Sequence, residues 1–272
     1  QLVGEQVYVL QGLAVPQEAT AVSQQSHSAV TLFLQHVNLV RPGTAVQPEE
    51  WPDVVRICRL VQGMPLALVL AAGWANMLSF AEIGAEIAQS LDFLETDLQD
   101  LPARQRSMRA VFDSSWKRLS PEEAAVLPRL ALFSGGFTRE AAQTICGANL
   151  RLLRQLMNRS LIAAAEQRYE MHELLRQYAL EKLTPDERVS LRQQFVAFFA
   201  AFMAQLVPGI QRSAYREASR QITTEQGNLT QAWNWLLTAV TEQPPTVENL
   251  ALLRPFIAAW HFYYYIQGPM AT

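Results

Sequence analysis

The stretch LRLLRQLMNRSLIAAAEQRYEMHE, residues 150–173, changes its pattern twice and decides how the middle of the chain folds. Leucines and arginines recur at helical spacing in its first part, which predicts a helix over residues 150–159. Two short extended runs follow, residues 161–164 and 169–171, and a polar turn separates them. This order predicts a small β-hairpin. A further helix is predicted to begin near His172.

The residues before this stretch predict three more helices. They cover residues 108–119, 121–133 and 139–146, and a Gly135-Gly136 turn lies between the second and the third. Several helices followed by a small hairpin are the layout of a winged helix, a relative of the helix-turn-helix. We therefore expect a winged-helix domain over residues 105–183.

Two short motifs mark helix starts in the same way. Ser120-Pro121-Glu122-Glu123 and Thr184-Pro185-Asp186-Glu187 each place a hydroxyl at the N-cap, a proline at the first helical position and an acid at the third. Ser79 and Glu82 have the same spacing of hydroxyl and acid, which predicts a capping box. All three signals predict helices rather than strands at these positions.

The region from residue 21 to residue 104 also has a helical pattern. Its first predicted helix has apolar residues on one face and Ser28 as the expected N-cap. Pro52 is expected in the first turn of the next helix. Gly63 supplies the left-handed residue that ends a helix, and Pro65 suits the first position of the following one. The apolar face of the first helix comprises Val30, Phe33, Leu34, Val37 and Val40.

After Pro185 the pattern is again helical, and we expect the start of a TPR-like helical repeat array over residues 184–272. The aromatic run at residues 260–265 precedes the last residue, Thr272, and an array that stops there would leave an uncovered face. We therefore expect truncation at this end. The two predicted apolar faces comprise Phe195, Phe198, Phe199 and Met203, and Leu229, Ala232, Trp233 and Leu236.

Composition limits the function classes. Half of the 272 residues are apolar and 17% are charged, which is typical of a globular chain with real cores. The net charge of −3 does not favour a protein that coats nucleic acid. Cys58 and Cys146 are interpreted as small buried hydrophobes, so neither a disulfide framework nor a zinc site is expected.

The beginning of the chain lacks a signal-peptide pattern, which favours a cytoplasmic location. Residues 60–81 carry no charge and are long enough to span a bilayer. Helix stop and start signals interrupt them, however, so we expect no contact with a membrane.

The sequence offers little chemistry for catalysis. A Walker loop needs Gly-x-x-x-x-Gly-Lys followed by Ser or Thr, and the two lysines, Lys117 and Lys182, do not follow a glycine. The four histidines have no metal-ligand spacing. Glu122 and Glu123 are explained by helix capping. We therefore expect that this chain alone is not an enzyme and has no catalytic or metal-binding residue.

Three motifs together resemble the STAND class of signal-transduction ATPases, in its NB-ARC or AP-ATPase-like bacterial regulator form. Gly63-Met64-Pro65-Leu66-Ala67-Leu68 is similar to the GxPLAL motif of their helical lid. Met171-His172-Glu173 resembles the Met-His-Asp motif that ends their winged helix, although Glu173 replaces the usual aspartate. Residues 225–237 resemble the entry to the repeats. The opening run from Gly4 to Pro16 looks like the exit segment of the family's nucleotide-binding core.

The resemblance implies a division into four parts. Residues 1–20 would leave a nucleotide-binding core that precedes Gln1, residues 21–104 would form the lid, and the winged helix and the repeats would follow. In the family, the proline of the lid motif lies against adenine and the histidine approaches the β-phosphate of ADP. These roles fall on Pro65 and His172, with Gly63 in the same turn.

The implied function is regulatory. The chain would sense whether the core holds ADP or ATP and relay that state to a protein partner through the repeats, in signalling or transcription regulation. ADP or ATP is expected to bind only together with the core. One alternative is a transcription regulator that contacts DNA through Arg151 and Arg154, although a solvated arginine face is the commoner explanation of such a pair. Another alternative is a helical-repeat scaffold that binds a protein.

Overall fold

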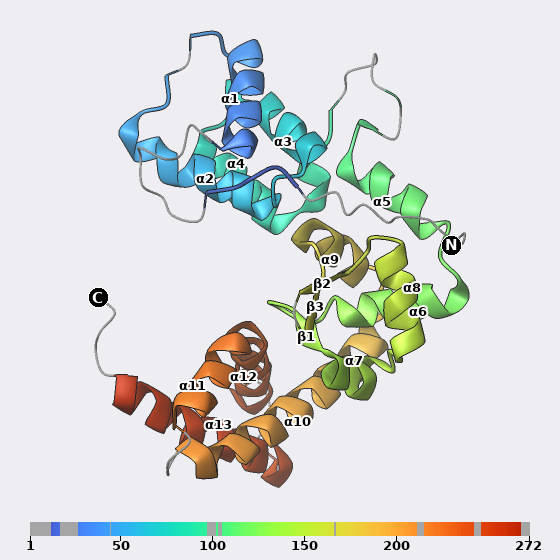
Figure 1. Ribbon diagram of the computed structural model, residues 1–272, viewed down its shortest axis with the longest axis vertical. Helices are drawn as coiled ribbons and strands as arrows, with labels where there is room; N and C mark the ends of the chain where they lie inside the picture. Colours follow the sequence, from blue (N-terminus) through green and yellow to red (C-terminus); the bar gives the residue numbers. More distant parts are fainter. Residues whose placement is uncertain are drawn as a thin grey trace. The chain divides into compact units, whose positions relative to one another are not determined.

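Our computed structural model shows a mainly helical chain with a small three-stranded sheet, which confirms the predicted fold class (Figure 1). The residues that the structure describes are 12–16, 27–43, 45–96, 102, 105–165, 167–210, 215–241 and 246–267. They group into two compact units. Unit 1 takes the chain up to Leu119 together with His172–Tyr178, and unit 2 takes Ser120–Met171 and the chain from Ala179 onward. Residues of the predicted 105–183 domain therefore occur in both units.

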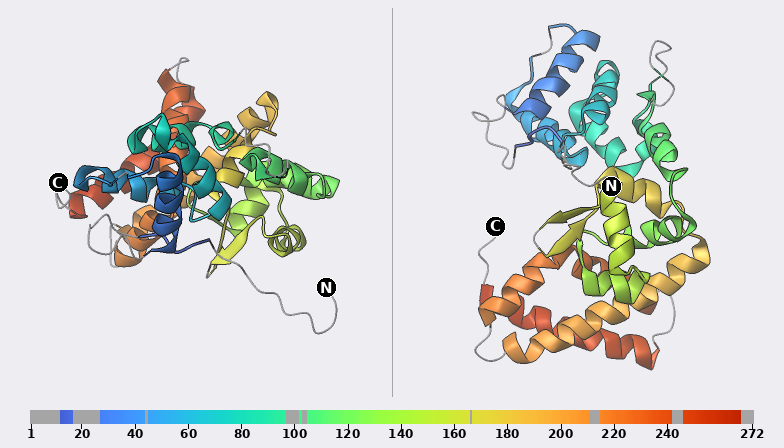
Figure 2. Two further views of the ribbon diagram at one scale, coloured as in Figure 1. Left: turned by 90° about the horizontal axis from the view of Figure 1, so that it is seen from above. Right: turned by 45° about the vertical axis from the view of Figure 1, so that its right-hand side comes forward.

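Unit 1 is built from two pairs of packed helices. Helix α1 packs on α3, and α2 packs on α4. The N-terminal trace 12–16 runs alongside them in both views (Figure 2). The bounds are α1 Ser28–Val40, α2 Trp51–Leu60, α3 Pro65–Ala72, α4 Phe80–Gln89 and α5 Met108–Trp116.

The helix signals in unit 1 act as the sequence predicts, with one exception. Pro65 is the first residue of α3, and Ser79 and Glu82 form a complete capping box at the start of α4. The expectation that Ser28 is an N-cap is wrong. Helix α1 begins at Ser28 after His27, and the Ser28 hydroxyl accepts a hydrogen bond from Ala14 N–H at 3.1 Å instead. The Ser28 hydroxyl therefore binds a backbone amide of a distant segment and not one in the first turn of α1.

Helix α5 and the first part of α9 (Glu173–Leu180) pack together within unit 1. Tyr178 is fully buried, and its ring contacts those of Phe112 and Trp116. Its hydroxyl donates a 2.6 Å hydrogen bond to the Asp113 carboxylate. A buried phenol with a satisfied hydroxyl is a stable anchor, so this cluster attaches His172 and its neighbours to α5.

Unit 2 begins with three helices and a sheet. The helices are α6 Pro121–Leu130, α7 Arg139–Cys146 and α8 Leu150–Asn158, and α7 matches the predicted range 139–146. The Ser120 capping box forms as expected. Glu123 completes it and also accepts a 2.8 Å hydrogen bond from Arg159 Nε. Burial acts to raise the pKa of this carboxyl, but the hydrogen bonds from Arg159 and Ser120 outweigh it and hold the pKa below its usual value.

The sheet contains the predicted hairpin and one strand that the sequence did not indicate. Strands β2 (Ala163–Ala165) and β3 (Arg168–Glu170) pair antiparallel, within two residues of the expected runs. Strand β1 (Phe137–Thr138) pairs with the other edge of β3, so the order is β1-β3-β2. A two-residue strand has no period that the sequence could reveal. Stacked rings of Phe137 and Tyr169 cover the β1–β3 pair.

The rest of unit 2 is a stack of helices, α10 Pro185–Ile210, α11 Tyr215–Thr224, α12 Gln226–Thr241 and α13 Val247–Gln267. Helices α12 and α13 both pack on the long α10. Figure 1 and the right-hand view of Figure 2 show α13 lying alongside α10. The predicted apolar faces form the core of this stack, where Phe195, Phe199, Met203, Leu229, Ala232 and Leu236 are buried.

Both cysteines are buried, as the sequence predicted, and burial raises the pKa of the Cys58 thiol to about 12. Within the described ranges, every helix is too short or too polar to cross a bilayer. Gly4 and Glu5 of the expected exit segment, like Glu166 of the predicted turn, lie outside the residues that the structure describes.

Candidate functional site

The turn between α2 and α3, residues 61–64, is where the sequence-predicted residues of unit 1 meet. The segment 12–16 lies against this turn. Leu13 N–H donates to the Gly63 carbonyl at 2.9 Å, and Arg59 Nε donates to the Pro16 carbonyl at 2.9 Å. Ala29 N–H donates to the Ala14 carbonyl at 3.2 Å. The turn is therefore held by a segment some fifty residues earlier in the chain.

The close approach at this turn requires glycine on both sides. Gly63 has φ +67°, the left-handed region that the sequence predicted for it, and a Cβ there would overlap the carbonyl oxygen of Leu13. A Cβ on Gly12 would overlap the carbonyl oxygen of Gln62, which itself has φ +46°. Because only glycine lacks a Cβ, the two glycines permit this backbone-to-backbone contact. A pair of distant glycines is the signal that sequence reasoning missed.

His172, the residue directly before α9, contacts the same turn. Its Nδ1 accepts a hydrogen bond from Leu174 N–H at 3.1 Å, and its Nε2 lies 3.2 Å from the carbonyl oxygen of Val61. Since Nδ1 is an acceptor, the proton of the neutral ring is on Nε2, which donates to Val61. Burial lowers the pKa of this imidazole, although the Val61 carbonyl and the Glu173 carboxylate act in the opposite direction. The ring is therefore neutral at pH 7.

Pro65 and Glu173 are the first residues of α3 and α9, the helices that begin next to this contact. Pro65 is solvent-exposed at the start of α3, so its rigid apolar ring is available to a ligand. Glu173 is bound by Arg176, whose Nε and Nη2 donate to its two carboxylate oxygens at 2.7 and 2.8 Å. The residue that departs from the family motif is therefore engaged within its own helix.

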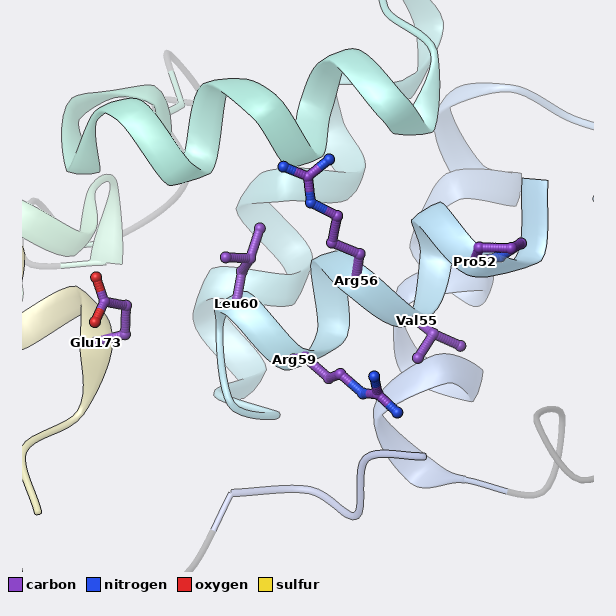
Figure 3. A pocket seen from close by; sticks show the side chains of 6 residues that line it. All are labelled: Pro52, Val55, Arg56, Arg59, Leu60 and Glu173. Atoms are coloured by element: carbon purple, nitrogen blue, oxygen red, sulfur yellow. The ribbon is translucent and has the colours of Figure 1, made fainter. Parts of the chain in front are cut away.

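A hollow of about 290 Å³ lies beside the turn, along α2 (Figure 3). Arg56 and Arg59 leave α2 in different directions there, and Glu173 approaches from α9. Apolar side chains cover much of the surface, and two arginines and one carboxylate contribute the charge. Its lining residues are Pro52, Val55, Arg56, Arg59, Leu60 and Glu173.

The described residues contain no group of three metal-ligating side chains. The side chains described at this site offer hydrogen bonds, an apolar proline face and arginine charge.

The predicted DNA-contact residues belong to unit 2 and form a separate feature. Arg151 and Arg154 are exposed on α8, and neither makes an ion pair or hydrogen bond within the described residues. The other two arginines of this region are engaged: Arg159 pairs with Glu123 at 2.8 Å, and Arg168 pairs with Glu225. Two of four candidate cations are therefore committed to intramolecular partners.

Comparison with known proteins finds mycobacterial relatives, some named as transcriptional regulators and others as uncharacterized. No family model matches the chain. A protein of Mycobacterium tuberculosis named "Putative HTH-type transcriptional regulator" is 29% identical over 218 residues, which are 76% of this chain and 25% of that protein. A protein of the same species named as uncharacterized is 31% identical over 172 residues, which are 58% of this chain and 44% of its own length. This chain thus spans less than half of either relative.

Among solved structures, a STAND protein with a tetratricopeptide repeat sensor from Pyrococcus horikoshii aligns with 87% of this chain and 42% of its own. The sequence identity is 16% and the TM-score is 0.30. At that TM-score the two arrangements differ too much for the match to establish a shared fold.

Proposed function

We propose that this chain is the nucleotide-sensing, regulatory part of a STAND-class ATPase. It would couple the ADP or ATP state of a separate nucleotide-binding core to a partner protein, in signalling or transcription regulation. The observation that carries the proposal is the hydrogen bond between His172 and the Val61 carbonyl. It brings the Met-His-Glu motif to the Gly-Met-Pro turn, and these are the two motifs that the resemblance assigns to one nucleotide.

The contact suggests how the site would respond to a nucleotide. His172 holds its Nε2 proton toward a neutral carbonyl, and a phosphate oxygen is a stronger acceptor because it is charged. A nucleotide at this turn would therefore compete with Val61 for the same proton. The exposed ring of Pro65 offers an apolar surface for adenine. ADP would favour the closed state, and exchange of ADP for ATP would release the chain from that state.

The mycobacterial relatives support a regulatory role, since one is named as a transcriptional regulator. The proposal assigns the phosphate loop and the magnesium ligands to the core, so this chain would not be an enzyme by itself. The stack of helices α10–α13 would offer a surface to the partner. Its described part exposes Val247, Leu250 and Ile257 on α13.

Calorimetry with ADP tests the proposal. The chain alone should bind ADP no more tightly than about millimolar, because it would contribute only the rim of the site. A longer protein that includes the core should bind ADP tightly, and His172→Ala should weaken this binding by about tenfold or more, the value of one hydrogen bond to a charged group. Pro65→Ala should weaken it as well.

His36→Ala is the matched control, because His36 lies on α1 of the same unit and belongs to neither motif. It should leave ADP affinity unchanged. Tight ADP binding by the chain alone, or equal affinity in the His172→Ala and wild-type long proteins, would contradict the assignment of the site.

A second candidate function is direct DNA binding by the predicted winged helix over residues 105–183, whose helix α8 belongs to unit 2. Arg151 and Arg154, exposed and unpaired within the described residues, favour it, and so does the name of the mycobacterial relative. The ion pairs of Arg159 with Glu123 and of Arg168 with Glu225 are evidence against it.

A further inference from the structure

A buried polar cluster in unit 2 joins the start of α12 to the turn before β1. Its centre is Asn228, whose side chain is fully buried. Asn228 Oδ1 accepts a 2.8 Å hydrogen bond from Ser134 N–H. Its Nδ2 donates to the Gly136 carbonyl at 2.9 Å and to the Glu225 carboxylate at 2.7 Å. Both donor hydrogens and one acceptor of this amide are therefore used, and two of the three bonds cross to the turn.

An ion pair extends the cluster to the hairpin. Glu225 is 7% exposed, and its carboxylate pairs with the guanidinium of Arg168 on β3. The same guanidinium donates to the Gly135 carbonyl at 3.4 Å. Glu225 therefore has one oxygen on the hairpin and the other on Asn228. We name the set of Arg168, Glu225 and Asn228 the hairpin clamp.

The backbone of α12 also touches the turn directly. A Cβ on Gly227 would overlap the carbonyl oxygen of Ser134, so only glycine fits this position without a shift. The amide of Gln231, one turn later on α12, donates to the Leu132 carbonyl. Contacts of α12 with the turn thus cover Leu132, Ser134 and Gly136 in succession.

These contacts differ in kind from those within the helix stack. Helices α10, α12 and α13 meet through apolar side chains, such as Phe256 against Trp233, and the hydrophobic interaction between them has no preferred direction. A buried amide with three partners is directional, because each hydrogen bond lost on displacement leaves a buried polar group unpaired. The clamp therefore fixes one geometry between α12 and the hairpin.

We propose that the hairpin clamp makes α12, the turn 133–136 and strand β3 move as one body, so that a displacement of α12 is delivered to the hairpin. The clamp also commits Arg168, the one arginine on β3, to Glu225 and withholds it from a nucleic-acid phosphate. The inference rests on contacts inside unit 2 and not on the nucleotide role proposed above.

Hydrogen exchange on the chain tests the clamp. In Asn228→Ala, amides of residues 134–138 and 168–170 should exchange about tenfold faster or more, while amides in α10 and α13 keep their protection. A tenfold change corresponds to about 1.4 kcal/mol of opening free energy. Asn234→Ala is the control, since Asn234 is exposed on the same helix and its side chain makes no hydrogen bond within the described residues. It should leave hairpin exchange unchanged.

A milder variant keeps the test valid if Asn228→Ala does not fold. Glu225→Gln and Arg168→Gln should each speed exchange in both the hairpin and α12, and the double variant should be no faster than either single one, because each removes the same pair. Glu217→Gln, which breaks an exposed pair with Arg220 inside α11, should leave the hairpin unchanged.

Two outcomes would overturn the proposal. One is hairpin exchange that does not change in Asn228→Ala or Glu225→Gln. The other is acceleration spread evenly over α10–α13, which would show ordinary loss of stability and no coupling. Neither outcome bears on ADP binding, so the two proposals can fail separately.

Discussion

The Nε2 atom of His172 lies 3.2 Å from the carbonyl oxygen of Val61, although 111 residues separate them. The contact joins the beginning of α9 to the residue that follows α2. It depends on a neutral imidazole, because Nδ1 is occupied as an acceptor by Leu174 N–H. Protonation of Nδ1 would place a second hydrogen against that amide and break the arrangement.

The stability of unit 1 should therefore fall when the solution is mildly acidified. Burial holds the folded-state pKa of His172 below its ordinary value of 6.5, so the unfolded chain takes up this proton at a higher pH than the folded chain does. The stability that the neutral ring confers is complete above about pH 6.5 and is lost as the pH falls towards the folded-state pKa.

Thermal unfolding at about pH 7.5 and about pH 5.5 measures this effect, in the range where histidine titrates. His172→Gln keeps a donor but has no proton to gain, so it should lose less stability between the two pH values than the wild type. Equal losses in both proteins would show that His172 is not the titrating group.

Substitution of Gly63 by alanine should destabilise unit 1 by about 1 to 2 kcal/mol or more. A left-handed conformation costs an alanine about that amount, and the new Cβ would in addition overlap the Leu13 carbonyl. Gly73→Ala is the control, because Gly73 is right-handed helical with open space around it, and it should gain up to about 1 kcal/mol. Urea unfolding would compare them. A Gly63→Ala protein as stable as Gly73→Ala would contradict the close packing of segment 12–16 on the turn.

Duplex DNA should bind this chain no more tightly than about micromolar at about 0.15 M salt, since phosphate binding requires several free cations. Among the arginines of α8, its C-cap and β3, Arg151 and Arg154 alone lack a partner in the described part of the chain. Gel-shift titration at two salt concentrations would measure the affinity. Submicromolar binding that falls in Arg151→Ala and Arg154→Ala, but not in the control Arg216→Ala on α11, would favour the DNA-binding function.

The sequence determined the helices and most of their ends. The Ser79, Ser120 and Thr184 starts form as predicted, each with its acid three residues on. Gly63 and Pro65 also separate α2 from α3 as expected. These features depend on residues within four positions of one another, and so the printed sequence contains all the information they need.

Part of the candidate site was also foreseeable. The two motifs around Gly63 and His172 were identified from their residues, and the structure brings both to one turn. The sequence did not indicate that Val61 is the partner of His172, because a backbone carbonyl has no residue-specific signature. The sign that residues 12–16 cover the turn, the pair of Gly12 and Gly63, was missed because the two glycines lie far apart in the sequence.

Tertiary structure alone decided the contacts between distant residues. Ser28 was predicted to be an N-cap, but its hydroxyl accepts a hydrogen bond from Ala14 N–H. Strand β1 exists because β3 offers a free edge beside a two-residue segment. Glu225 and Asn228 were interpreted as part of a repeat motif, yet the Asn228 side chain binds a turn some ninety residues earlier. Local patterns specify where helices begin and end, whereas the partner of a buried polar group depends on which backbone the folded chain places beside it.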